Sequence, residues 1–467
     1  MERSVTLAQV LDAREARAKR QEKLLEAYRL PVISFTMNIA GPVKNSPVLR
    51  RAFQEGLERL ALALQGADIG IVTQEQVDQP TGCEALLTVK GDGRAVKVLC
   101  TELEDEDALG RLFDLDVLTP DRGKWDREQL GLGPRRCLIC GREGKGCASR
   151  RLHTVEELQR ATQKILWDYF SKRDRDTVAS LAARALLYEV CTTPKPGLVD
   201  RTNNGSHRDM DLFTFSDSTT ALYSYWGQAV AVGQETAEQE PQETFRKLRR
   251  LGVRAERTMF RATGGVNTHK GAIFSLGTVC SAVGRLWTPA GVDRDVAAIL
   301  RECGRMSADA TETDLKMLTW DTAETMGQRL YLEHGLRGIR GEVADGLPSV
   351  EKIGLPVLKE LLAQGVPLEE AGVTVLLHLM AGVTDTNLIA RGGWTGQQWA
   401  AEQARALLDR QAVPKRQAVE ALDRELIARN LSPGGCADLL AITYFLHFYS
   451  QKKELRVPFV RLRKTYC

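Results

Sequence analysis

The chain has 467 residues, of which 27% are charged and 43% hydrophobic, and its formal net charge at pH 7 is +3. This length predicts two or three domains with sizeable cores, and so small a net charge argues against nucleic acid as the main partner. Residues 1–20 mix acidic and basic side chains and lack the apolar segment of a signal peptide. We therefore expect a cytoplasmic protein whose ten cysteines are reduced. The longest apolar runs, Gly271–Gly284 and Ala437–Tyr449, are too short to span a bilayer, so no membrane partner is expected.

The first part of the chain predicts mixed α and β structure. Apolar residues at helical spacing predict a helix over Leu7–Tyr28, and a second helix is expected over Val48–Leu64. Runs of β-branched and aromatic residues predict strands. These runs are Val32–Met37, Ile69–Thr73, Glu84–Val89, Ala95–Cys100 and the strand-like Gly110–Leu118.

Asp114 and Asp116 form a D-x-D pair in the last of these runs. Side chains two apart on a strand point to the same face, so both carboxylates can hold one Mg²⁺ at a triphosphate. Arg111 lies just before them, where it can contact phosphate. The rigid loop Gly41–Pro47 offers Lys44, which either binds phosphate or belongs to a simple turn.

A cysteine-rich segment follows, with the order Cys137-x2-Cys140-x6-Cys147-x5-His153. A structural, tetrahedral Zn²⁺ site is chemically reasonable for this ligand set. The loose spacing of the second pair, which encloses Arg150 and Arg151, favours the alternative, a nucleotide-contacting segment with reduced thiols.

Taken together, Asn38–Pro47, Gly110–Leu118 and the cysteine segment resemble the holo-acyl-carrier-protein synthase family of citrate lyase, the apo-citrate lyase phosphoribosyl-dephospho-CoA transferases. The resemblance covers about Leu7–Phe170 and implies an α+β, nucleotidyltransferase-like domain. In that family a serine hydroxyl of the apo acyl carrier protein attacks the phosphate adjoining a ribose, and pyrophosphate leaves. The resemblance implies metal binding by Asp114 and Asp116.

The polar run Ser171–Asp176 is the best linker in the sequence, so we expect domains at residues 1–172 and 177–467. Beyond it the apolar period is 3.6 throughout, which predicts an all-α domain. Its helices are expected near Val178–Cys191, Phe215–Gly233, Thr244–Arg261, Thr268–Leu286, Val292–Ser307, Glu351–Gln364, Leu368–Thr384, Thr395–Leu408, Arg416–Arg429 and Cys436–Lys452.

Four polar, glycine-containing stretches interrupt these helices: Thr192–Asp211, Gly264–Lys270, Asp385–Gly393 and Asn430–Asp438. Each can be an ordinary capped turn, because turns use the same residues. Four such stretches in one helical domain favour a single site assembled from several helix ends.

The stretch Ala262–Lys270 has the composition of an anion site at a helix start. Gly264 and Gly265 would let the backbone approach a phosphate, Asn267 would cap the helix, and Lys270 and His269 would contact the anion. The alternative is a glycine C-cap, a short turn and an N-cap between two core helices.

These motifs, with Glu189–Arg201 and His207–Asp211, resemble the triphosphoribosyl-dephospho-CoA synthase family over about Val178–Lys453. That family transfers a triphosphoribosyl unit from ATP to the ribose 2′-hydroxyl of 3′-dephospho-CoA and expels adenine. Departure of the base builds positive charge at C1 of the ribose, which carboxylates stabilise, and the triphosphate needs Mg²⁺ and cations. We expect Asp209, Asp211, Asp385 and Asp438 for metal or oxocarbenium stabilisation, and Lys195, Arg201, His207, Lys270 and Arg391 for phosphates.

The two resemblances together predict a bifunctional enzyme that makes the citrate lyase prosthetic group from ATP and 3′-dephospho-CoA and attaches it to the apo acyl carrier protein. Two alternatives remain open at this point. The helical domain is an ADP-ribosyl hydrolase-like enzyme that transfers to water, or the protein is a non-catalytic assembly chaperone whose glycine loops only cap helices.

Overall fold

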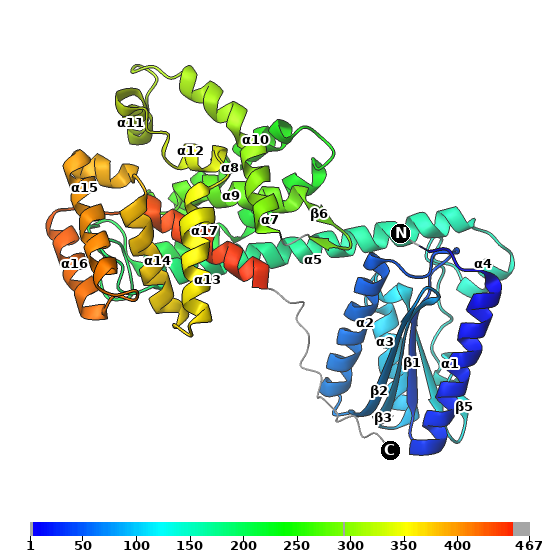
Figure 1. Ribbon diagram of the computed structural model, residues 1–467. Coiled ribbons are helices and arrows are strands. Elements are labelled where there is room, and N and C mark those ends of the chain that lie inside the picture. Colours follow the sequence, from blue (N-terminus) through cyan, green and yellow to red (C-terminus); the bar gives the residue numbers. More distant parts are fainter. Residues whose placement is uncertain (1–2, 293–294, 452–467) are drawn as a thin grey trace. The chain divides into compact units, whose positions relative to one another are not determined.

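The computed structural model describes residues 3–292 and 295–451, which form two compact units (Figure 1). One unit contains residues 3–172 with 288–291, and the other contains residues 173–287, 292 and 295–451. The expected end of the last helix at Lys452 lies outside the described residues, as do the outer limits of the two expected domains.

The first unit is a five-stranded antiparallel sheet with the strand order β2-β3-β1-β4-β5, covered by helices on both faces. The side chain of Phe35 in β1 stacks on Phe53 of α2, so α2 packs on the apolar face. Gln21 of α1 donates to Ser34 Oγ, so α1 covers the opposite face. The elements of this unit are α1 (Leu7–Tyr28), β1 (Val32–Met37), α2 (Pro47–Gly66), β2 (Gly70–Gln79), β3 (Gly82–Lys90), α3 (Gly93–Asp105), η1 (Gly110–Leu112), β4 (Phe113–Thr119), β5 (Gly123–Lys124), η2 (Glu128–Leu130) and α4 (Gly144–Ser149).

The strand expected at Ala95–Cys100 is wrong, because this segment belongs to helix α3. Asp92 caps the helix by accepting the Ala95 N–H at 2.9 Å. Val96 and Cys100, four residues apart, are buried on the same side of the helix. A short alternation of apolar and polar residues here matched a strand, although the buried residues recur with the helical period.

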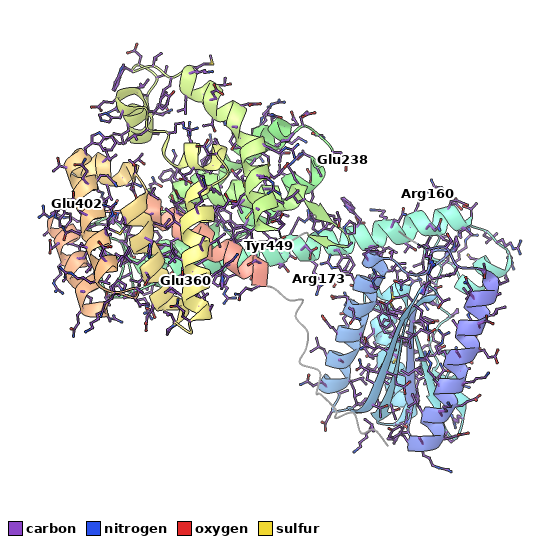
Figure 2. The ribbon with its side chains drawn as sticks, in the orientation of Figure 1. Arg160, Arg173, Glu238, Glu360, Glu402 and Tyr449 are labelled. Carbon is purple, nitrogen blue, oxygen red and sulfur yellow. The ribbon has the colours of Figure 1, made fainter. Side chains whose placement is uncertain are left out.

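The expected linker Ser171–Asp176 is also helical, since α5 runs without a break over Val155–Cys191. Figure 2 labels Arg160 and Arg173, which both stand on this helix. The polar run contains neither glycine nor proline, so nothing in it stops a helix. The polarity of this run indicates exposure to solvent, but an exposed segment can be helical as well as irregular.

The second unit is largely helical, in agreement with the all-α expectation; its residues Trp287 and Val292 begin and end a short hairpin of β6 (Trp287–Thr288) and β7 (Gly291–Val292). The expected Phe215–Gly233 helix is broken in two at Leu222, and two short helices, α11 and α12, were not expected. After α5, the helices are α6 (Leu212–Ala221), α7 (Tyr223–Glu235), α8 (Pro241–Ala262), α9 (Lys270–Arg285), α10 (Val296–Lys316), α11 (Met326–His334), α12 (Gly338–Ala344), η3 (Val350–Gly354), α13 (Leu355–Ala363), α14 (Leu368–Gly382), α15 (Thr386–Arg410), α16 (Arg416–Ala428) and α17 (Gly434–Gln451).

Helices α9, α14 and α17 form the centre of this unit, because most of their residues are buried on every side. Helix α7 packs closely on α9, and a Cβ atom added to Gly233 would lie 2.1 Å from the Ser281 carbonyl oxygen. Within the described part of the chain, no single helix is long and apolar enough to cross a membrane. Only the pair α14 and α15, bent by 57°, reaches that length and apolarity together.

Candidate active sites

The second unit contains a cavity of about 870 Å³, a size suited to a nucleotide or cofactor. The first residues of α9, α15 and α17 line it, among them Lys270, Asn387 and Gly435. Helix N-termini present free N–H groups and the positive end of the helix dipole, so this cavity favours anions. Three of the four polar stretches predicted to converge supply these helix starts, and the fourth supplies Lys195 and His207.

His207 interacts with residues of two other polar stretches, and together they form one wall of the cavity. His207 Nε2 lies 2.9 Å from Ser432 Oγ, and its Nδ1 lies 3.2 Å from Arg391 Nη2. Arg391 also donates to the Ser206 carbonyl at 2.9 Å and to Asn430 Oδ1 at 3.1 Å. Burial and the Arg391 charge lower the pKa of His207, so the ring is neutral at neutral pH.

Lys195 lines the cavity and forms an ion pair with Glu189. Both side chains are buried, with exposed fractions of 2% and 5%. Since a buried charge is costly without a partner, each of the two groups needs the other. A bound phosphate would approach an ammonium group that is already neutralised by Glu189.

Asp438, the fifth residue of α17, differs from the other carboxylates that line the cavity. Among the described residues, it alone of these carboxylates has neither a hydrogen bond nor an ion pair. A Cβ atom on Gly271 would lie 1.9 Å from Asp438 Oδ2, so the carboxylate rests on the first turn of α9. Burial, with the charges of Glu189 and Asp385 nearby, raises the pKa of Asp438 well above its usual range.

Asp385 differs from Asp438, because its carboxylate accepts hydrogen bonds from backbone N–H groups and caps helices. Oδ1 accepts the N–H of Asn387 at 2.7 Å, at the start of α15, and Oδ2 accepts the N–H of Cys436 at 2.9 Å, at the start of α17. The side chain is 2% exposed. Asp385 therefore fixes the positions of two helix starts relative to each other.

His269 immediately precedes α9 and is 3% exposed. The Thr268 hydroxyl donates to Ser218 Oγ, which leaves the Ser218 hydroxyl free to donate to His269 Nδ1 at 2.6 Å. This arrangement places the ring proton on Nε2, which has no hydrogen-bond partner among the described residues. Burial and the charge of Lys195 lower the pKa of His269 to about 3. Asn267 caps the helix, as its Oδ1 accepts the Lys270 N–H at 3.2 Å.

Five of the residues expected at this site do not line the cavity, namely Arg201, Asp209, Asp211, Gly264 and Gly265. Arg201 pairs with Glu369, and the Asp209 side chain is 64% exposed. Asp211 caps α6 by accepting the Thr214 N–H at 2.8 Å. The two glycines, at φ 63° and 94°, end α8, where the Gly265 N–H donates to the Phe260 carbonyl at 2.7 Å. At these glycines the alternative expectation of a C-cap describes the local structure.

Glu189, Arg337 and Arg340 also line the cavity but are not among the residues expected there. Arg337 and Arg340 lie in the run Arg-Gly-Ile-Arg-Gly at the start of α12. Two arginines between glycines are a phosphate-binding signal by which they could have been predicted. Glu189 gave no comparable signal, because its significance depends on the ion pair with Lys195.

In the first unit, Asp114 and Asp116 occupy the same face of β4. They lie opposite Thr36 and Ser34 of β1, on the face that α1 covers. Arg135 Nη1 approaches Asp114 Oδ1 at 3.3 Å, and Lys124 Nζ approaches Asp116 Oδ2 at 2.7 Å. Two half-exposed carboxylates beside two cations can accept a metal ion together with phosphate groups.

The other two residues expected at that site are held by backbone carbonyls. Arg111 donates to the Arg136 carbonyl, and its buried Nε has no partner among the described residues. Lys44 donates to the Ile39 carbonyl, and burial, with the charge of Arg14, lowers its pKa. The described contacts of Lys44 include neither Asp114 nor Asp116.

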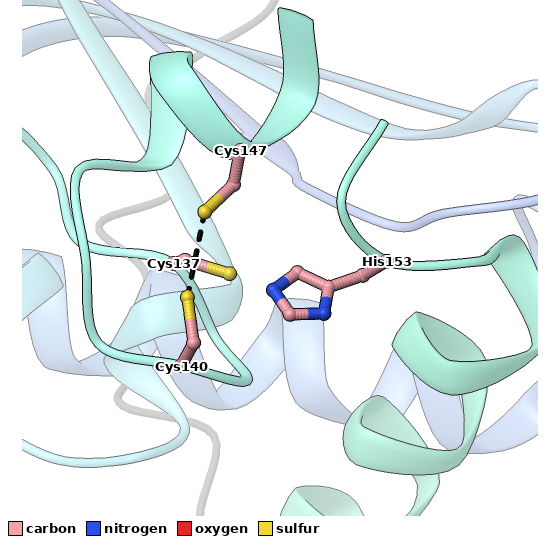
Figure 3. A group of neighbouring side chains, drawn as sticks. All are labelled: Cys137, Cys140, Cys147 and His153. Atoms are coloured by element: carbon pink, nitrogen blue, oxygen red, sulfur yellow. Dashed lines mark hydrogen bonds between the residues drawn. The ribbon is translucent and has the colours of Figure 1, made fainter. Parts of the chain in front are cut away.

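The cysteine segment of the first unit folds into one cluster. Each of Cys137, Cys140, Cys147 and His153 offers a ligand atom, and all four atoms lie within 4.8 Å of one another (Figure 3). Cys140 Sγ lies 3.4 Å from Cys147 Sγ, and the cysteines are free. A hydrogen bond with His153 lowers the pKa of Cys140 to about 6.

Two protein-family models match the chain in succession. Residues 5–169 match the apo-citrate lyase phosphoribosyl-dephospho-CoA transferase family, and residues 175–457 match the ATP:dephospho-CoA triphosphoribosyl transferase family. A protein named CitXG from Haemophilus influenzae is 37% identical over 456 residues, covering 95% of this chain and 96% of that protein. CitXG from Leuconostoc mesenteroides is 35% identical over 470 residues, covering 95% and 97%.

A third relative matches a shorter part of the chain. It is a probable 2-(5′′-triphosphoribosyl)-3′-dephosphocoenzyme-A synthase of Vibrio cholerae, 43% identical over 283 residues, covering 60% of this chain and 90% of that protein. These matches favour the transferase interpretation over the hydrolase and chaperone alternatives. The chain therefore belongs to the CitXG family of bifunctional transferases, which combine an apo-citrate lyase phosphoribosyl-dephospho-CoA transferase with a triphosphoribosyl-dephospho-CoA synthase.

Proposed function

We propose that the cavity of the second unit binds ATP and 3′-dephospho-CoA and that Asp438 is its catalytic acid and base. The observation that carries this proposal is the unpaired carboxyl group of Asp438 among three helix N-termini. The helix starts, with Lys270 and Arg391, would hold the triphosphate, because they are among the cationic and dipolar groups that line the cavity. His269 Nε2, which lacks a described partner, is free to donate to a substrate oxygen.

The proton balance of the reaction fits one carboxyl group with a raised pKa. The 2′-hydroxyl of 3′-dephospho-CoA forms a bond to C1 of the ATP ribose, and the bond from C1 to adenine breaks. The hydroxyl loses a proton and adenine gains one. A single residue can therefore donate a proton to adenine and recover one from the hydroxyl. Burial raises the pKa of Asp438 well above its usual range, which suits donation of a proton to the leaving base.

We do not place Mg²⁺ at Asp209 and Asp211, because Asp211 caps α6 and neither residue lines the cavity. A magnesium ion in this unit would therefore be held mainly by the triphosphate itself. In the first unit, Asp114 and Asp116 do fit a magnesium ion, since they share one face of β4. There the ion would neutralise charge on the phosphates.

In the first unit, we propose a nucleotidyltransferase-like reaction at this face of β4. A serine hydroxyl of the apo citrate lyase acyl carrier protein forms a bond to the phosphorus next to the ribose, and the bond to pyrophosphate breaks. Arg135 and Lys124, beside the two carboxylates, would stabilise the negative charge of the phosphates as the bond breaks. Arg111 lies in the turn just before β4, where it can assist.

The experiment that tests the role of Asp438 measures adenine release from ATP with 3′-dephospho-CoA by the purified full chain. Asp438→Asn keeps the shape of the side chain but removes the titratable group. We expect adenine release to fall by about 10²–10⁴-fold, the usual contribution of a general acid or base. A variant with unchanged adenine release would refute the proposal.

A further inference from the structure

We propose that Cys137, Cys140, Cys147 and His153 form a tetrahedral Zn²⁺ site that holds together the segment between β5 and α5. The proposal does not depend on the reaction assigned to the cavity of the second unit or on the reaction assigned to the sheet of the first unit. It reverses the sequence-based preference for a nucleotide-contacting segment, because all four potential ligands meet at one point (Figure 3).

The first two ligands lie on a tight turn of the form used to bind zinc. Gly141, at φ 69°, follows Cys140, and its N–H donates to the Cys137 carbonyl at 3.2 Å. The Cys137 N–H donates to the Arg142 carbonyl at 2.6 Å, which closes the turn. The Ile139 N–H lies 3.5 Å from Cys137 Sγ and donates to it. This turn directs two sulfur atoms to one point and provides a donor for one of them.

The other two ligands come from separate parts of the chain. Cys147 lies on the short helix α4, and His153 lies just before α5. In Figure 3 one ring nitrogen of His153 points toward the three sulfur atoms. With Zn–S bonds of 2.3 Å, neighbouring ligands of a tetrahedral zinc ion lie about 3.8 Å apart. The four ligand atoms already lie within 4.8 Å of one another, and Cys140 Sγ and Cys147 Sγ lie 3.4 Å apart, so only small shifts of the ligands are needed.

The segment has almost no hydrophobic core of its own. Among the side chains described between β5 and α5, only those of Trp125, directly after β5, and of Cys137 and Cys147 are buried. The regular structure of the segment consists of η2 and α4, which have three and six residues. A segment that buries so little apolar surface needs another source of stability, and a bound metal provides one. Zinc explains why the two side chains buried after Trp125 are both cysteines.

Of the metals that proteins bind, this set of ligands favours zinc. Three thiolates and one imidazole form a closed, four-coordinate set with no place for water or substrate, as in structural zinc sites. The complex would carry a charge of about −1, and arginines at positions 135, 136, 142, 150 and 151 surround it in the sequence.

The site also has a consequence for the neighbouring sheet. The Gly144 N–H donates to the Arg135 carbonyl at 2.7 Å, and Arg136 forms a β-bridge with Glu143. Arg135 in turn contacts the carbonyl of Phe113 and the carboxylate of Asp114. The zinc ion would therefore fix the strand-like arm that carries Arg135 against the start of β4.

The test is the metal content of the full chain, purified under reducing conditions without chelators and measured by inductively coupled plasma mass spectrometry. We expect about one zinc ion per chain, and X-ray absorption with three sulfur and one nitrogen neighbour. Cys140→Ser and His153→Ala should each reduce the zinc content at least tenfold. The control Cys83→Ser, in β3 of the same unit, should keep it.

Several results would overturn the proposal. These are a wild-type chain that remains free of zinc after incubation with zinc and removal of the excess, iron in place of zinc, or a Cys140→Ser chain with full zinc content. A disulfide between Cys140 and Cys147 in the reduced preparation would also contradict it. Because no activity is measured, these outcomes are independent of the proposed reactions.

Discussion

Asp385 and Asp438 were assigned the same role from the sequence, but their carboxylates have different surroundings. Asp385 accepts N–H groups at the starts of two helices, and Asp438 has no described partner. The sequence could not separate them, because each aspartate stands near a glycine at a predicted helix end. The distinction depends on whether backbone N–H groups from another helix reach the carboxylate, which only the tertiary structure determines.

The same reason accounts for the other site residues. Four polar loop residues that were expected at one site, Lys195, His207, His269 and Arg391, line one cavity. Asp211 was expected there too but forms a local helix cap instead. Aspartate serves both purposes with the same atoms, so residue type and spacing do not decide between them.

Gly271→Ala tests the position of Asp438 without changing its chemistry. The added Cβ would lie 1.9 Å from Asp438 Oδ2, so the carboxyl group must move. We expect adenine release to fall by about 100-fold, because a displacement of this size disrupts a reactive geometry. The control is Gly252→Ala in α8, where the nearest atom to the added Cβ is 3.8 Å away and full activity is expected. Equal activities of the two variants would contradict the assignment.

His269 should make the stability of the second unit depend on pH. Its pKa is about 3 in the folded chain and near its ordinary value in the unfolded chain, so below about pH 6.5 only the unfolded state binds this proton. The free energy of unfolding should therefore fall as the pH falls, by about 1.4 kcal/mol per pH unit from this residue.

Urea unfolding of the wild type and of His269→Gln between pH 7 and pH 5 measures this effect. The difference between the two slopes isolates His269 from other histidines. We expect the variant to lose less stability on acidification. Parallel curves would show that His269 does not remain neutral in the folded chain.

At the scale of elements, helices and strands with a clear apolar period were predicted well. The errors lie in segments whose pattern of polar residues is compatible with more than one structure. The helix Leu7–Tyr28 and the strand Val32–Met37 agree with α1 and β1 residue for residue. The expected linker Ser171–Asp176 lies inside α5, because charged residues are compatible with an exposed helix. The segment Ala95–Cys100 fits both the period of a strand and the period of a helix, and the N-cap Asp92 stabilises the helix.

The packing of α7 to α10 depends on one buried arginine. Arg285 of α9 donates to Glu302 of α10 at 2.6 Å, to Thr244 of α8 at 2.7 Å, and to the Thr236 carbonyl at 2.6 Å. Its side chain is 6% exposed and that of Glu302 is 5% exposed. Arg285→Ala would leave a buried carboxylate with a weaker partner, so the free energy of unfolding should fall by about 3–5 kcal/mol.

Arg305→Ala is the matched control for this prediction. Arg305 pairs with the same carboxylate at 2.7 Å, but its side chain is 65% exposed. The expected loss is less than about 1 kcal/mol, as for other surface ion pairs. Similar losses in the two variants, measured by chemical denaturation, would show that burial of Arg285 does not determine its contribution.

At the scale of the whole molecule, the chain combines two transferases of the citrate lyase system, whose family models match residues 5–169 and 175–457 in succession. The family resemblance, carried by motifs in both halves, predicted this combination from the sequence. Each unit has its own candidate site, a cavity at three helix starts and a polar face of a sheet. Because the proposed sites share no residue, the two reactions should be separable by single substitutions.

Two substitutions, assayed for both reactions by mass spectrometry, test this claim most directly. Asp116→Ala should abolish loading of the apo acyl carrier protein and leave adenine release from ATP and 3′-dephospho-CoA unchanged. Asp438→Asn should lose adenine release, yet load the carrier when purified triphosphoribosyl-dephospho-CoA is supplied. Loss of both reactions through either substitution, in a variant that remains folded, would contradict the assignment of one reaction to each unit.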